Sequence, residues 1–206
     1  MLRLWGRTTS SNVQKVMWLC AELALPYERI DAGGPFGRTQ EPAYLALNPN
    51  GLVPTIEDDD FVLWESNTIL RYLANRHGAH AWYPVEPRAR AQVEKWMDWS
   101  STTFGPALFN AFWQLVRTPP EQRDAAVIAE SVRKTATVLR IADAQLAARA
   151  FLCGDAPTLA DVCIGVNAYR WFALPIERPD LPALRAWYDR LAQRQPYRDV
   201  VMIPIR

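Results

Sequence analysis

The chain has 206 residues, half of them apolar, with nine tryptophans and a formal net charge of +1 at pH 7. This size allows one large domain or two small ones, each with a sizeable core. Because the charges nearly cancel and no block of like charges occurs, we expect no nucleic-acid and no membrane partner.

The sequence shows no features of a leader or a membrane span. Its first residues contain no long apolar region with a cleavage site, and no later run reaches about 18 apolar residues. We therefore expect a cytoplasmic protein. Cys20, Cys153 and Cys163 are odd in number and far apart, and only His77 and His80 could join them. We expect neither a disulfide framework nor a metal site.

The chain begins with a strand, a helix and a second strand. Residues 2–5 have the pattern of a short strand. Apolar residues then recur at every third or fourth position, which predicts one buried face of a helix. They are Val13, Val16, Met17, Cys20 and Leu23. Pro26 ends this helix, a strand follows from Tyr27, and residues 33–37 form a glycine-rich loop.

A hairpin and a helix follow. Two short strands, residues 55–57 and 61–64, are joined by an acidic turn. Helical spacing resumes at Ser66 and ends near Gly78, since glycine suits the C-terminal cap of a helix. We assign residues 1–80 to a small α/β domain.

Beyond a proline-containing linker, residues 82–90, the sequence predicts helices only. A stripe of apolar residues at helical spacing begins at Val93, and we expect Pro106 to kink or break that helix. Residues 125–149, which are rich in Ala and Arg, predict another helix. We assign residues 88–206 to an all-helical domain.

Two more helices are expected near the C-terminal end. Thr158 and Asp161 have the spacing of a capping box, with Thr158 as the N-cap residue. We expect both residues to be structural, stabilising their helix by about 1 kcal/mol. A last helix is predicted at residues 181–194, between Pro179 and Pro196.

Three stretches of the sequence are distinctive when taken in order. They are "SNVQKVMWLCAELALPYERID", "LNPNGLVPTIEDDDFVLWESNTILRYLA" and "PTLADVCIGV". Together they lie in order along nearly the whole chain, and the chain resembles the cytosolic glutathione transferases. The resemblance implies a thioredoxin-like α/β N-terminal domain and an all-α C-terminal domain. It also implies a homodimer that binds reduced glutathione, stabilises its thiolate and conjugates it to an apolar electrophile.

The resemblance assigns glutathione contacts to the Val-Pro and Glu-Ser pairs. Pro54 is expected to be cis, with Val53 pairing with glutathione through its N–H and C=O like an added strand. Glu65 would accept from the γ-glutamyl ammonium, while Ser66 and the first N–H groups of its helix would hold the carboxylate. The structural alternatives are that Pro54 only starts a strand and Ser66 only caps a helix.

One family feature is missing. A Lys commonly precedes the Val-Pro pair, and Leu52 stands at that position here. Two residues are candidates to replace the contact of this Lys. Asn50 would supply a hydrogen bond, and Arg38 would reach the glycine carboxylate of glutathione.

The polar cluster "TTSSN", residues 8–12, lies directly before the first helix. The resemblance places Ser10 where a hydroxyl donates to the glutathione sulfur, with Ser11 and Asn12 as alternatives. A helix N-terminus with such donors can lower the pKa of a thiol from about 8.5 to roughly 3.5–7.5 without an acid or a metal. The structural alternative is that Ser10 or Ser11 only caps the helix.

Four aromatic residues are candidates for the wall of the electrophile pocket, although an aromatic stripe in a helix is also typical of a core. They are Phe109, Phe112, Trp113 and Trp171. Two other functions remain open at this stage. One is a glutathione-dependent disulfide reductase that uses bound glutathione as its redox partner. The other is a non-catalytic binding protein with the same fold. Two features are compatible with it: Leu52 in place of the family's Lys, and the open choice among Ser10, Ser11 and Asn12 for the sulfur contact.

Overall fold

Four short strands form a mixed sheet at the N-terminal end of the computed structural model, which describes residues 1–205. They are β1 (Leu2–Trp5), β2 (Glu28–Ile30), β3 (Thr55–Asp58) and β4 (Phe61–Trp64), in the order β2-β1-β3-β4. β1 pairs with β2 in parallel, and β3 is antiparallel to both β1 and β4. All four predicted strands are present, and Asp58 extends β3 into the predicted turn.

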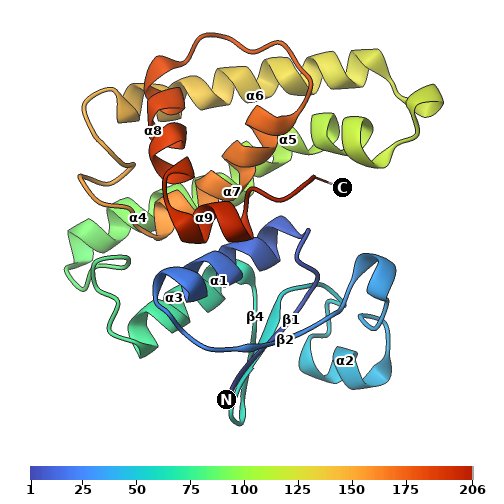
Figure 1. Cartoon of the computed structure of the whole chain (residues 1–206), viewed down its shortest axis with the longest axis vertical. Helices are drawn as coiled ribbons and strands as arrows, with labels where there is room; N and C mark the ends of the chain where they lie inside the picture. Colours follow the sequence, from blue (N-terminus) through green and yellow to red (C-terminus); the bar gives the residue numbers. More distant parts are fainter. Residues whose placement is uncertain (206) are drawn as a thin grey trace.

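Two helices lie on the side of the sheet that faces the rest of the molecule (Figure 1). They are α1 (Ser11–Glu22) and α3 (Ser66–Arg76), both as predicted. The predicted loop after β2 contains a 3₁₀ turn, η1 (Gly34–Phe36), and is followed by a short helix, α2 (Pro42–Leu47), that the sequence did not predict. Since α2 buries only Tyr44, it has no apolar periodicity to detect.

The rest of the described chain is helical, which confirms the predicted fold class. Its segments are α4 (Pro87–Trp99), η2 (Ser100–Phe104), α5 (Gly105–Phe112), η3 (Trp113–Arg117), η4 (Pro120–Gln122), α6 (Ala125–Leu146), α7 (Leu159–Ala173), α8 (Pro182–Ala192) and α9 (Gln195–Val200). Two expectations were wrong in detail. Residues 87–90 of the predicted linker belong to α4. The helix predicted as the last one, α8, is followed by α9, and Pro196 lies in the first turn of α9, where its missing N–H costs nothing.

The sequence predicted either a kink or a break at Pro106; the chain stays helical through this residue, so the break was wrong. The helix is irregular just before this proline: its α-helical hydrogen-bond pattern changes to the π-helical segment η2, directly before α5. A π segment widens the helix and tolerates a residue that cannot donate to the preceding turn.

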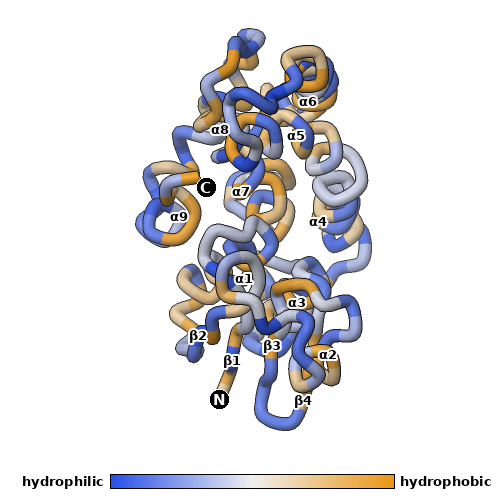
Figure 2. Tube along the Cα trace, turned by 90° about the vertical axis from the view of Figure 1, so that its right-hand side faces the viewer, coloured by the Kyte–Doolittle hydropathy of each residue, from blue (hydrophilic) through white to orange (hydrophobic). Residues whose placement is uncertain are grey.

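α7 is the central helix of the helical part, with α4 and α5 on one side and α9 on the other (Figure 2). It also packs against α1 of the sheet domain. Gly165 permits this close approach: a Cβ there would lie 2.9 Å from Leu191 and 3.0 Å from Trp18. A larger residue at this position would push α1, α7 and α8 apart.

Cys20 and Cys163 are fully buried in the core, and Cys153 is half-buried. Within residues 1–205, none of the helices is both long and apolar enough to cross a membrane.

Candidate functional site

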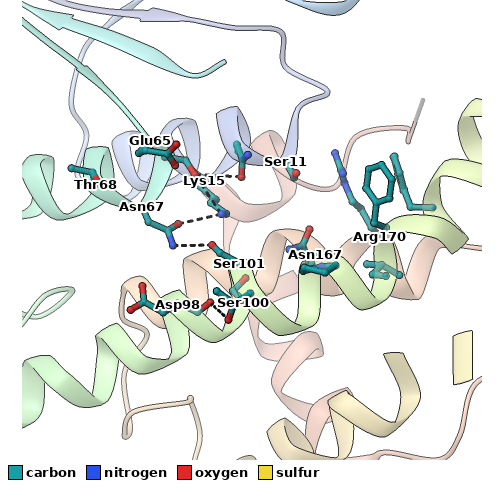
Figure 3. A pocket seen from close by; sticks show the side chains of 18 of the residues that line it. Ser11, Lys15, Glu65, Asn67, Thr68, Asp98, Ser100, Ser101, Asn167 and Arg170 are labelled. Carbon is teal, nitrogen blue, oxygen red and sulfur yellow. Dashed lines mark hydrogen bonds between the residues drawn. The ribbon is translucent and has the colours of Figure 1, made fainter. Parts of the chain in front are cut away.

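A cavity of about 620 Å³ lies between the sheet domain and the helical domain (Figure 3). Its walls come from the first turns of α1 and α3 on one side, and from η2, α5 and α7 on the other. It is polar around the starts of α1 and α3 and aromatic along α5. Segments distant in sequence therefore meet around one opening.

The polar cluster before α1 stands at one edge of this cavity. Ser10 is the N-cap residue of α1, with φ −81° and ψ 125°, but its side chain makes no capping hydrogen bond. Ser11 and Asn12 line the cavity, whereas Ser10 is not part of its wall. The tight turn before the cluster needs Gly6, because a Cβ there would lie 2.4 Å from Val13 Cγ2.

The Glu-Ser pair forms the start of α3 on the same cavity wall. Glu65 adopts φ +72°, a left-handed conformation that side chains rarely occupy, and its carboxylate is exposed. Such a conformation costs of order 1 kcal/mol and is common at functional sites. Ser66 is buried, and its hydroxyl donates to Asn12 Oδ1 at 3.3 Å. The starts of α1 and α3 are thus in direct contact.

A buried lysine beneath this contact is a feature that the sequence interpretation missed. Lys15 is only 4 % exposed, and its ammonium donates to Asn67 Oδ1 at 3.2 Å and to Ser66 Oγ at 3.5 Å (Figure 3). Burial lowers the pKa of Lys15, an effect that the nearby Glu65 carboxylate partly offsets. The sequence did contain a signal for Lys15. It is a charged residue four positions after Ser11, a spacing that places both residues on the same side of α1.

Asn67 links Lys15 to the helical domain through hydrogen bonds. Its amide Nδ2 donates to the Met97 carbonyl at 3.0 Å and to Ser101 Oγ at 3.2 Å. The Cys163 thiol donates to Asn67 Oδ1 at 3.3 Å. Lys15 therefore belongs to a hydrogen-bond network that joins α1 and α3 to α4, η2 and α7.

The Val53–Pro54 peptide bond is cis, as expected. Two side chains hold the backbone just before it: Tyr44 Oη and Asn48 Nδ2 both donate to the Leu52 carbonyl, at 2.6 and 2.9 Å. The Leu52 side chain itself is 65 % exposed. Neither Val53 nor Pro54 is part of the cavity wall described above.

Asn50 and Arg38, the two candidates to replace the contact of the missing Lys, lie outside the cavity. Asn50 uses its amide Nδ2 to donate to Asn48 Oδ1 at 3.0 Å. Arg38 is exposed and adopts φ +66°. The structure therefore places both in the segment between β2 and β3, and not in the cavity wall.

The four aromatic candidates separate into two groups. Phe109 and Phe112 line the cavity. Trp113 is 50 % exposed and stacks on Phe109 with ring centroids 5.6 Å apart, outside the cavity wall. Trp171 is 1 % exposed and is part of the core, so the structure does not bring it to the cavity.

Comparison with known proteins gives one consistent result. Residues 1–75 match the family described as "Glutathione S-transferase, N-terminal domain", and residues 104–195 match "Glutathione S-transferase, C-terminal domain". The chain is 43 % identical to glutathione S-transferase GstB of Escherichia coli K12 over 207 aligned residues, covering 100 % of both chains. It is 32 % identical to glutathione S-transferase 3 of Zea mays, covering 99 % of this chain and 95 % of that protein.

A solved structure agrees with these relatives. The theta-class glutathione S-transferase from Xanthomonas axonopodis pv. citri, with glutathione bound, superposes with a TM-score of 0.96. The two chains are 46 % identical, and the match covers 100 % of this chain and 99 % of that one.

Proposed function

This chain belongs to the glutathione S-transferase family and is a glutathione S-transferase, and from that premise we propose how its cavity holds reduced glutathione. The γ-glutamyl end lies at the start of α3 and the sulfur at the start of α1. One observation carries this proposal: the hydrogen bond from Ser66 to Asn12 brings the two helix starts together in one cavity. A tripeptide can therefore contact both.

The start of α3 suits an amino-acid end group that carries both charges on one carbon. The first N–H groups of α3 can donate to its carboxylate, because a helix N-terminus carries partial positive charge. The Ser66 hydroxyl can donate to the same carboxylate when it turns from Asn12 Oδ1 to the ligand. The exposed Glu65 carboxylate can accept from its ammonium. Val53 and Pro54 then offer their backbone to the cysteinyl part, as the family resemblance implies.

The start of α1 suits a thiolate. Ser10 makes no capping bond with its side chain, so its hydroxyl is available as a donor to sulfur. In the reaction the thiol proton passes to solvent, the sulfur forms a bond to the electrophilic carbon, and the leaving group departs with its electron pair. The enzyme's task is to keep the sulfur ionised at neutral pH and close to the electrophile.

We expect the thiol of bound glutathione to have a pKa at least about one unit below its free value near 8.5, which corresponds to about 1.4 kcal/mol of thiolate stabilisation. Ultraviolet absorbance of the thiolate, recorded against pH with saturating glutathione, measures it. The blank is the same complex with S-methylglutathione, which has no ionisable thiol. An unshifted pKa in a protein that still binds glutathione would disprove the proposed sulfur site.

We propose that Lys15 positions Ser66 and Asn67 for the γ-glutamyl carboxylate. Lys15→Met should raise the KM for glutathione about tenfold, because hydrogen bonds to a charged group contribute about 1.5–3 kcal/mol. We expect kcat to change less, since Lys15 contacts the α3 side of the cavity. Steady-state kinetics with varied glutathione measure both constants.

The matched control is Lys134→Met, which removes a surface lysine of α6 that pairs with Glu130. It should leave both constants unchanged. Ser66 and Asn67 line the cavity, where water can replace the lost donor, so thermal unfolding of Lys15→Met should stay close to wild type. A KM for glutathione equal to wild type would contradict the positioning role.

The electrophile lies against Phe109 and Phe112 in this proposal, because these rings form the apolar part of the cavity wall. A cytoplasmic homodimer is part of the same proposal and rests on family membership alone.

A further inference from the structure

An arginine of the helical domain contacts the loop that carries Ser10. Arg170 of α7 lines the cavity at the end that is remote from Glu65 and Asp98 (Figure 3). Its Nη2 donates to the Thr9 carbonyl at 3.0 Å, across 161 positions of the chain. Arg170 therefore holds the residue directly before Ser10.

The peptide unit between Thr9 and Ser10 is held at both of its polar atoms. Its carbonyl accepts from Arg170, and its N–H, which belongs to Ser10, donates to the Arg7 carbonyl at 3.2 Å. Because a peptide unit is planar, two such contacts fix the orientation of the whole unit. Ser10 adopts φ −81° and ψ 125° directly after it. The direction of the Ser10 Cα–Cβ bond, and with it the region that the hydroxyl can reach, depends on this orientation.

The rest of this loop is held by the sheet domain. The Gly6 N–H donates to the Ile30 carbonyl at 2.9 Å, and the Arg7 N–H donates to the Ala32 carbonyl at 3.0 Å. The bond from Arg170, by contrast, comes from the other domain. The position of the peptide unit before Ser10 is therefore set by how the two domains pack together.

An aromatic ring holds the guanidinium of Arg170 in place. Its Cζ lies 4.3 Å from the centre of the Phe112 ring, and both residues line the cavity. Contact of a guanidinium with an aromatic face is attractive and orients the plane of the group. Burial lowers the pKa of Arg170 to about 10, with smaller effects from Arg117 and Arg7, so Arg170 remains a cation at neutral pH. A charged donor makes a stronger hydrogen bond to a carbonyl than a neutral one does.

We propose that Arg170 is a positioning residue for catalysis: by holding the Thr9 carbonyl, it aims the Ser10 hydroxyl at the sulfur of bound glutathione. Phe112 belongs to the wall where we place the electrophile, so Arg170 also connects this wall to the sulfur site. The inference rests on the proposed function, because Arg170 acts through the Ser10 contact. No bond is made or broken at Arg170 itself.

Three other roles of Arg170 predict different measurements. If it only joins the two domains, its loss lowers stability and leaves the thiol pKa of bound glutathione unchanged. If its charge acts on the sulfur directly, its loss raises this pKa whether or not the Ser10 hydroxyl is present. If it binds a carboxylate of glutathione, its loss raises the KM for glutathione.

Arg170→Met should raise the thiol pKa of bound glutathione by about one unit, because the Ser10 hydroxyl remains but is no longer aimed at the sulfur. At a pH below both pKa values, the thiolate fraction and therefore kcat should fall about tenfold, since one pKa unit is a factor of ten. The KM for glutathione should hardly change, because Arg170 is remote from the start of α3. Ultraviolet absorbance of the thiolate and steady-state kinetics measure these effects.

The deciding measurement combines Arg170→Met with Ser10→Ala. In the Ser10→Ala background, the Arg170 substitution should add less than about 0.3 units to the thiol pKa, because two residues that act through one contact are not additive. A rise of about one unit in both backgrounds would show a direct effect of the charge and overturn the inference. An unchanged pKa in Arg170→Met alone, or a KM for glutathione that rises in place of the pKa, would overturn it as well.

Two further substitutions keep the test independent of folding. Arg170→Lys retains a cationic donor for the Thr9 carbonyl and should recover most of the wild-type pKa. Arg170→Gln is too short to reach this carbonyl but keeps a polar side chain, so it replaces Arg170→Met if that variant does not fold. It should raise the thiol pKa to the same extent.

The matched control is Arg190→Met. Arg190 Nε donates to the Ala150 carbonyl at 3.0 Å, a contact of the same kind that lies outside the cavity. Its loss should affect stability and leave the thiol pKa unchanged. If the wild-type pKa is lowered and responds to Ser10→Ala but not to Arg170→Met, the inference alone fails. If the wild-type pKa is not lowered at all, the proposed sulfur site fails and the inference fails with it.

Discussion

Asp161→Ala is expected to lower the free energy of unfolding by about 3–5 kcal/mol, because it leaves several buried donors without an acceptor. The carboxylate of Asp161 is fully buried. It accepts from the Thr158 N–H at 2.9 Å, the Leu152 N–H at 3.1 Å and the Trp187 indole at 2.8 Å. One side chain thus holds the start of α7, the loop before it and α8 together.

Denaturant unfolding followed by tryptophan fluorescence, at one fixed protein concentration, measures this loss. Asp155→Ala is the matched control, because Asp155 is an exposed acid in the same loop and should change the free energy by less than about 0.5 kcal/mol. Asp161→Asn keeps the volume and one acceptor oxygen, so we expect a loss between those of the other two variants. A loss below about 1 kcal/mol for Asp161→Ala would show that the network contributes little.

Ser10→Ala should reduce kcat/KM about a hundredfold, which is typical for removing one donor from a developing or stabilised anion. The thiol pKa of bound glutathione should rise in parallel by about two units, or about 2.7 kcal/mol. The fold should hardly change, because the Ser10 side chain makes no capping hydrogen bond to lose. Activity and stability can therefore be measured as separate effects in this variant.

The neighbouring variants Ser11→Ala and Asn12→Ala locate the sulfur contact. Both residues line the cavity, and Asn12 already accepts from Ser66 through Oδ1, which leaves its amide N–H groups to donate. We expect smaller losses for both than for Ser10→Ala. If Ser10→Ala keeps the full rate while Asn12→Ala loses it, the contact belongs to Asn12.

The helices that the sequence predicted are those long enough to show a full apolar period. α1, α3 and α6 have 12, 11 and 22 residues. The two missed helices, α2 and α9, have six residues each and bury one side chain each, Tyr44 and Tyr197. Both also begin with a proline in their first turn, a residue that ends a helix elsewhere but is tolerated there.

The candidate site was predictable where its residues adjoin a short motif. Glu65 and Ser66 follow a hairpin, and Ser11 and Asn12 start a helix, so the family resemblance assigned them to the site through short motifs, and all four line the cavity. The aromatic candidates were less predictable, because the same helical spacing fits a core residue and a cavity residue. Trp171 faces the core, whereas Phe109 and Phe112 line the cavity.

By itself, the sequence determined the order of strands and helices and the family, and through the family the reaction. These depend on local periodicity and on motifs of a few adjacent residues. Only the tertiary structure decided which distant groups the charged side chains contact. Lys15 lies 51 positions from Ser66, and Arg170 lies 161 positions from Thr9. Contacts at such separations are set by how whole helices pack, and no periodicity along the chain encodes them.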